Sequence, residues 1–136
     1  MERAITMIML TSAMLVLGGT FLTSYAAFSE RAESAANKVT TEYAAHKMAE
    51  AVAWAVSEAK VQEVPTALVI FFSEQILVEA SGRNIDVARV VDGHETKASL
   101  TLYLQIDIAP VGLASSAFNV TGFPDGRCVI SQCPTR

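Results

Sequence analysis

The chain has 136 residues, of which 51% are hydrophobic and only 18% charged, a balance that excludes a disordered linker and leaves room for one ordinary domain. Its net charge of −4 comes from 10 Lys and Arg against 14 Asp and Glu. No basic cluster is present to drive counterion release, so we expect no nucleic acid partner.

The first predicted element is an apolar segment. Ala4 to Ser29 contains no Asp, Glu, Lys, Arg or His, and it exceeds the roughly 20 residues that a helix needs to cross a bilayer. This segment predicts a membrane-embedded stage in the life of the protein. The alternative is a cleaved secretory signal, with Ser24-Tyr25-Ala26 as a cleavage site of the small-x-small type.

Small residues are scattered through this segment, and small residues let helices approach each other closely. Gly18 and Gly19 each cost about 1 kcal/mol of helix propensity relative to Ala, so the pair is either a close contact point or a flexible joint. We expect the segment to pack on other helices. A simple single-pass anchor remains the alternative.

The same helix is expected to continue to residue 64. Between Ser29 and Pro65 there is no Gly or Pro, and good helix formers dominate. Apolar residues recur there at steps of three and four: Ala32, Ala35 or Ala36, Val39, Tyr43, Ala49, Val52, Ala53, Val56 and Ala59. The pattern predicts one helix of about 60 residues, on the order of 90 Å long.

Residues 1–64 therefore form the predicted helical part, with an apolar part over 4–29 and an amphipathic part over 30–64 that packs on a head over 65–136. Val39, Tyr43, Val52 and Val56 are the residues expected to make that packing. Because the first part is apolar on every face, lipid or copies of itself must cover it in water.

From Thr66 the apolar period changes to two, which is typical of strands. The clearest alternation covers residues 100–108, and further strands are expected at 66–72, 75–80, 84–91, 117–121 and 127–131. Turn signals separate them at 81–84, 92–93 and 124–126. The chain is thus predicted to be α+β, with one very long helix followed by a small antiparallel sandwich or barrel.

Three residues in the head suggest covalent modification. Cys128 and Cys133 are spaced to close a short disulfide loop in an extracellular setting, with two reduced thiols as the alternative. Neither histidine is near them in sequence, so we expect no metal site. Asn119-Val120-Thr121 is a possible N-glycosylation site.

The sequence contains no G-x-S-x-G, P-loop, G-x-G-x-x-G or H-E-x-x-H motif, so we expect neither an enzyme nor a cofactor.

An apolar N-terminal helix that runs on into an amphipathic half, followed by a small β domain, resembles the type IV pilin superfamily. An all-β head is most similar to the archaeal type IV pilins and the related archaellins. Bacterial members carry a glutamate at the fifth mature position, where this chain has Ile5, and this favours the archaeal branch. The resemblance extends over the whole chain in layout.

The resemblance implies an extracellular filament for adhesion, with a membrane-embedded precursor, a core of bundled helices and a shell of heads that contact surfaces or host cells. The core-packing residues it implies are Ile5, Ile8, Leu10, Leu15, Leu17, Gly18, Gly19, Phe21 and Leu22. The competing functions are a rotary filament and a membrane-anchored or secreted β domain that binds an envelope partner or ligand.

Overall fold

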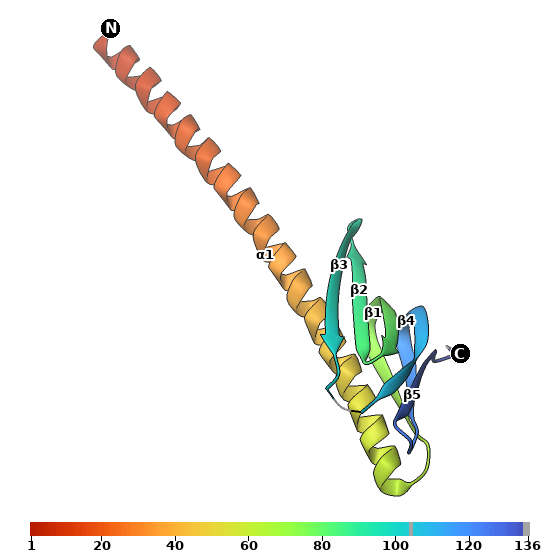
Figure 1. Cartoon of the computed structure of the whole chain (residues 1–136). Helices are drawn as coiled ribbons and strands as arrows, with labels where there is room; N and C mark the ends of the chain where they lie inside the picture. The colour runs from red at the N-terminus through yellow and green to blue at the C-terminus, as the bar shows by residue number, and fades with distance from the viewer. Residues whose placement is uncertain (104, 135–136) are drawn as a thin grey trace. The chain divides into compact units, whose positions relative to one another are not determined.

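The computed structural model describes residues 1–103 and 105–134 of the chain. Helix α1 is followed by five strands (Figure 1). Their bounds are α1 Glu2–Gln62, β1 Thr66–Gly82, β2 Asn84–Val91, β3 His94–Thr101, β4 Asp107–Gly122 and β5 Arg127–Gln132. The predicted α+β class, with one long N-terminal helix before a β-rich head, is confirmed.

Helix α1 ends at Gln62, two positions before the predicted end. Glu63 follows with a φ of 57°, the left-handed conformation that commonly terminates a helix. Pro65, which lacks an amide hydrogen, then excludes any continuation. The predicted stop signal is therefore correct, and the chain leaves the helix just before it.

The chain divides into two compact units, Met1–Ala36 and Asn37–Arg136, which we call the N-terminal unit and the head unit. This division lies inside α1 and differs from the expected boundary between residues 64 and 65. The physical reason is that a face of α1 from Thr41 to Ala59 is buried together with the strands. That part of the helix therefore shares their core.

The strands form one sheet in the order β3-β2-β1-β4-β5 within the described part of the chain. The β2–β3 turn is formed by Asp92 and Gly93, whose φ angles are 51° and 77°. Two successive positive φ angles are typical of the tight turn that matches the twist of a hairpin. The other predicted turns, at 81–84 and 124–126, are also found between strands.

Strands β1 and β4 form a long ribbon that doubles back on itself. Thr66 pairs with Gly122 at one end of the ribbon, and Gly82 pairs with Ile108 at the other. Cys128 of β5 lies opposite both Gly122 and Ile108, so the two ends meet at this residue. The reversal falls at the register shift between Phe71 and Ile76, and Figure 1 shows both strands arching over.

The expected antiparallel sandwich or barrel thus takes the form of a single rolled sheet. Beside the start of β4, β5 runs parallel, with Asp107 opposite Arg127. Along the end of β4 the residue numbers of the β5 partners fall as those of β4 rise, from Phe118 opposite Gln132 to Gly122 opposite Cys128. This order is that of antiparallel strands. Rolling brings the apolar faces of both ends of the ribbon onto one core.

The predicted strand over residues 100–108 is wrong. Thr101 ends β3 and Asp107 begins β4, and Leu104 lies outside the described residues. The alternation in burial is nevertheless real, because Leu102 and Ile106 are buried whereas Tyr103 is 95% exposed. A period of two specifies an extended backbone with one buried face, and it does not specify a hydrogen-bonded neighbour.

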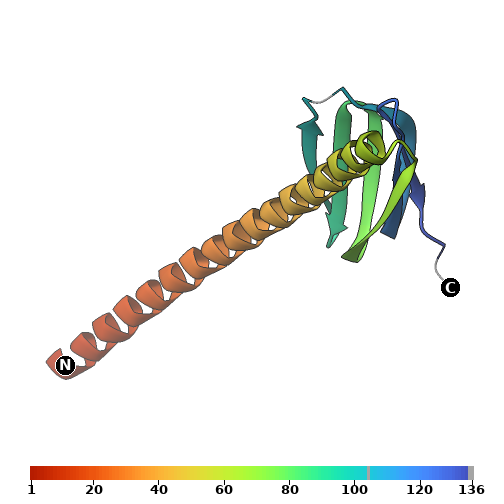
Figure 2. The same cartoon turned by 90° about the horizontal axis from the view of Figure 1, so that it is seen from below.

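The core of the head unit lies between the rolled sheet and the last turns of α1, which cross the sheet in Figure 2. Its fully buried side chains come from the helix and from every strand except β3; the largest are Phe118, Met48, Ile76, Ile85, Ile108, Val52 and Val56. Leu100 of β3 packs on this cluster from its edge. One apolar core therefore holds α1 to the strands.

Candidate assembly surface

In the single chain, the apolar part of α1 is exposed over its whole length. None of its most apolar 18-residue window is buried. The residues expected to pack in a filament core are all exposed, namely Ile5, Ile8, Leu10, Leu15, Leu17, Gly18, Gly19, Phe21 and Leu22. Their packing against other copies stays a prediction, and the surface it requires is present on the N-terminal unit.

Hydroxyl groups in this part of the helix are bonded to its own backbone. The Oγ1 of Thr6 donates to the carbonyl oxygen of Glu2 at 2.8 Å, and Thr20 does the same to Val16 at 3.0 Å. Ser12 donates to Ile8 at 2.8 Å. Because these hydroxyls are already satisfied, they do not oppose transfer of the helix into a water-free environment.

Gly18 and Gly19 make no close contact that the described residues explain. A β-carbon added at either position meets no described atom within 4 Å beyond the adjoining backbone of its own helix. Gly122 is different, because a β-carbon there would lie 2.4 Å from the carbonyl carbon of Ala55. Packing within the head unit thus requires a glycine at position 122. For the pair in the apolar helix, close packing against another helix stays a prediction.

Of the four residues expected to join helix and head, Val52 and Val56 are buried, as predicted. The prediction is wrong for Val39 and Tyr43, which are 64% and 65% exposed. The buried face is formed by Thr41, Ala44, Ala45, Met48, Ala51, Val52, Ala55, Val56 and Ala59. Small alanines set this face because they let the sheet approach closely, as the contact between Gly122 and Ala55 shows.

Trp54, which lies on the same part of α1, is about half exposed. Together with Val39, Tyr43 and Val61 it leaves apolar side chains exposed on the head part of α1. The predicted stripe passed through Val39, Tyr43 and Ala49, whereas the structure buries a neighbouring face through Ala44, Met48 and Ala55. Alanines recur at steps of four on the buried face, at 51, 55 and 59, and also at 45, 49 and 53, of which 49 and 53 lie beside it, so this repeat does not identify the buried face by itself.

The prediction of a disulfide between Cys128 and Cys133 is wrong, since both cysteines are free. Cys128 lies in β5 and Cys133 follows its end, where its amide donates to the carbonyl oxygen of Ala117 at 3.1 Å. An extended chain separates these two Cα atoms by about 16 Å, and a disulfide needs less than about 7 Å. Burial raises the pKa of the Cys128 thiol from 9.0 to about 11.

Asn119, the expected glycosylation residue, lies in β4 between Val69 of β1 and Ser131 of β5. It is half-buried, and its Oδ1 is buried without a hydrogen-bond partner. Glycosylation here stays a prediction.

The turn before β5 has a local charge pair. The backbone amide of Arg127 donates to Oδ1 of Asp125 at 3.1 Å, and its Nε donates to Oδ2 at 2.5 Å. The hydrogen bond from the backbone amide of Arg127 is the main reason that the pKa of the Asp125 carboxyl group is lowered, and the guanidinium lowers this pKa further. Both side chains are exposed, so the pair organises the turn more than it stabilises the fold.

Among the described residues, no three His, Cys, Asp or Glu side chains are grouped so that they could hold a metal ion. Helix α1 is long and apolar enough to cross a membrane, a test that a signal sequence near the N-terminus also passes. The largest chemically distinctive feature described in the structure is therefore the exposed apolar helix surface.

No family model, curated protein or solved structure matches this chain.

Proposed function

We propose that this chain is the structural subunit of an extracellular type IV pilus-like filament that serves adhesion and attachment to surfaces. The observation that carries the proposal is the uncharged segment from Ala4 to Ser29, a helix whose most apolar window is wholly exposed in the single chain. Such a surface is not stable in water and requires a cover. Lipid covers it before assembly, and other copies of the same helix cover it in the filament.

Two features favour other copies over lipid alone as the final cover. Gly18 and Gly19 carry a helix-propensity cost of about 1 kcal/mol each, and no contact with the described residues explains them. Close helix packing between copies gives them a purpose. The same helix also continues into the head unit, where one of its faces is buried in a core. Each subunit thus joins a self-associating segment to a folded domain.

In this arrangement the apolar helices bundle as the filament core and the head units form the outer shell. The precursor waits in the membrane through the same apolar segment. Contacts with surfaces or host cells are made by the exposed strands of the head unit. A membrane-anchored β domain that binds an envelope partner is the alternative, favoured by the fact that α1 satisfies the requirements of a single span.

The proposal is tested by negative-stain electron microscopy of material sheared from the surface of the producing cells, combined with mass spectrometry of its components. Uniform thin fibres with this chain as their main component, still carrying residues 4–29, are expected. A chain recovered only as a detergent-bound monomer supports the anchored domain instead. A soluble form beginning near Ala27 identifies the apolar segment as a signal and overturns the proposal.

A further inference from the structure

Arg89 occupies a core position that its strand would normally give to an apolar residue. Ile85 and Val87 of β2 face the core, and Arg89 continues this alternation with only 6% of its surface exposed. It is the one charged residue buried among those that the structure describes. A buried cation is costly unless it is paired, so its partners define what it does.

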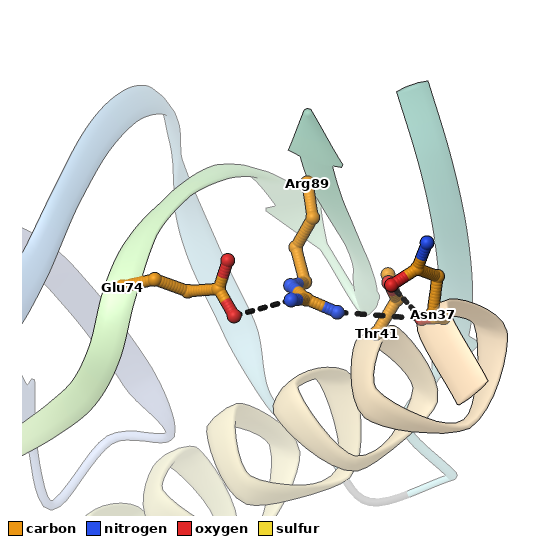
Figure 3. A network of polar contacts seen from close by, with 4 residues as sticks. All are labelled: Asn37, Thr41, Glu74 and Arg89. Atoms are coloured by element: carbon orange, nitrogen blue, oxygen red, sulfur yellow. Dashed lines mark hydrogen bonds and ion pairs between the residues drawn. The ribbon is translucent and has the colours of Figure 1, made fainter. Parts of the chain in front are cut away.

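The guanidinium of Arg89 links β1 to the helix, as Figure 3 shows. Its Nη2 is paired with Oε1 of Glu74. Its Nη1 donates to the carbonyl oxygen of Asn37 at 3.4 Å, and the buried hydroxyl of Thr41 donates to the same oxygen at 2.8 Å. Asn37 is the first residue of the head unit. Arg89 therefore binds the helix at the point where the helix begins to pack on the strands.

Glu74 belongs to the bend at which β1 doubles back. Residues 72–75 have no partners in the register of β1 with β4, since pairing stops at Phe71 and resumes at Ile76. A second cation holds the start of this bend, because Nζ of Lys47 donates to the carbonyl oxygen of Phe71 at 2.6 Å. Side chains from the helix and from β2 thus contact the bend and the residue just before it.

Polar links help to hold this end of the head unit, and a cleft interrupts its packing. A cleft of about 290 Å³ lies between the helix and the bend, with Tyr43, Lys47, Phe72 and Arg89 among its lining residues. The Nε of Arg89 is buried and has no hydrogen-bond partner among the described residues. Farther along the helix, Met48, Val52 and Ala55 are completely buried. Regions with few apolar contacts open at lower free-energy cost than a packed core.

We propose that Arg89 is a latch that closes this end of the head unit. When it is released, helix residues 37–44 and bend residues 72–75 open together as one local unit, while the packed section from Met48 to Ala59 remains closed. Opening detaches about two turns of helix from the strands. The latch therefore sets how much of α1 the head unit holds, whether or not the chain forms a filament.

Hydrogen exchange measured by mass spectrometry on the full chain in detergent tests the latch. Arg89→Met removes the cation and keeps an unbranched apolar side chain. We expect about tenfold faster exchange in peptides covering 38–45 and 72–76, because both partners lose their link. Peptides covering 51–59 are expected to exchange as in the natural chain. Glu74→Gln keeps the shape of the side chain and is expected to give the same pattern with a smaller increase.

Arg127→Met is the matched control, since it removes an arginine from an exposed ion pair in a turn remote in sequence from the latch. It is expected to leave all of these peptides unchanged. Unchanged exchange at 38–45 in Arg89→Met, or an equal increase at 51–59, overturns the proposal. If Arg89→Met does not fold, Glu74→Gln decides: faster exchange at only one of the two segments also contradicts a latch that opens both.

Discussion

At Gly122 a side chain of even one carbon meets the backbone of α1, with 2.4 Å between the added atom and the carbonyl of Ala55. Neither backbone is free to move, because both lie in the core of the head unit. We expect Gly122→Ala to lower the free energy of unfolding by about 2 kcal/mol or more. Denaturant unfolding followed by the fluorescence of Trp54 measures this loss.

Gly112→Ala is the control for this prediction. A β-carbon at Gly112 lies at an ordinary distance, 3.9 Å, from Cγ of Glu79 in the same ribbon. Its unfolding free energy is expected to change by less than about 0.5 kcal/mol. Equal stability of the Gly122→Ala and Gly112→Ala variants would show that α1 does not approach the sheet as closely as described.

The two thiols are expected to differ in reactivity. Burial holds the pKa of Cys128 at about 11, so its thiolate is scarce at about pH 8, whereas Cys133 is only partly buried. In the folded chain, iodoacetamide should modify Cys133 first and Cys128 only after unfolding, as peptide mass spectrometry will show. A disulfide-linked peptide containing both cysteines would contradict the free thiols.

The same shift makes the stability of the head unit depend on pH. The folded state raises the pKa of Cys128 and so favours the neutral thiol. The stabilisation is complete below the ordinary value of 9.0 and is lost as the pH rises towards about 11. Cys128→Ala should weaken this loss in denaturant unfolding between those two values, while Cys133→Ala should not.

At the scale of the element, α1 has a buried and an exposed face within the head unit. Val52 is completely buried and Val39 is mostly exposed, so the same truncation at the two sites compares the faces directly. We expect Val52→Ala to cost about 2 kcal/mol and Val39→Ala less than about 0.5 kcal/mol. Denaturant unfolding of the full chain in detergent measures both. A larger loss at Val39 would restore the face predicted from periodicity.

The apolar part of α1 is expected to tolerate charge in the single chain and not in an assembly. Leu15 is exposed, so Leu15→Asp removes no contact made by the described residues. In a packed bundle of helices, however, the carboxylate has no partner and is desolvated. Fibres should be absent from cells that produce this variant, as judged by electron microscopy of sheared material.

Tyr103→Asp supplies the comparison, since it introduces the same charge at a position of the head unit that is almost fully exposed. Fibres of this variant should assemble normally. Normal fibres from Leu15→Asp would show that this residue does not lie in a filament core.

For the whole molecule, an assembly built on residues 4–29 should resist salt and yield to detergent. The segment contains no charged residue, so about 1 M salt has no ion pair to screen there. Detergent offers the same apolar side chains an alternative cover. Sedimentation of isolated fibres in each solvent measures the effect. Dissociation by salt alone would indicate that charged contacts between head units hold the assembly.

The sequence predicted well those features that depend on local chemistry. The length of α1 follows from its helix formers and from Pro65, and the turn after β2 follows from Asp92 and Gly93, although the strand β3 that comes next was not predicted. Prediction from the sequence failed for features that depend on contacts between residues far apart in the chain. The alternation through Leu102 and Ile106 did not give one strand, because β3 ends its pairing with β2 at Thr101 and β4 begins only at Asp107.

The amino-acid sequence by itself determined that this protein has an uncharged helix surface in need of a cover, because charge and hydropathy belong to each residue wherever it lies. Only the tertiary structure decided which helix face meets the sheet, since that depends on how closely Gly122 lets the strands approach Ala55. It also decided that Cys128 and Cys133 stand apart and that Arg89 joins Glu74 to the helix. These contacts connect distant parts of the chain, and no local pattern encodes them.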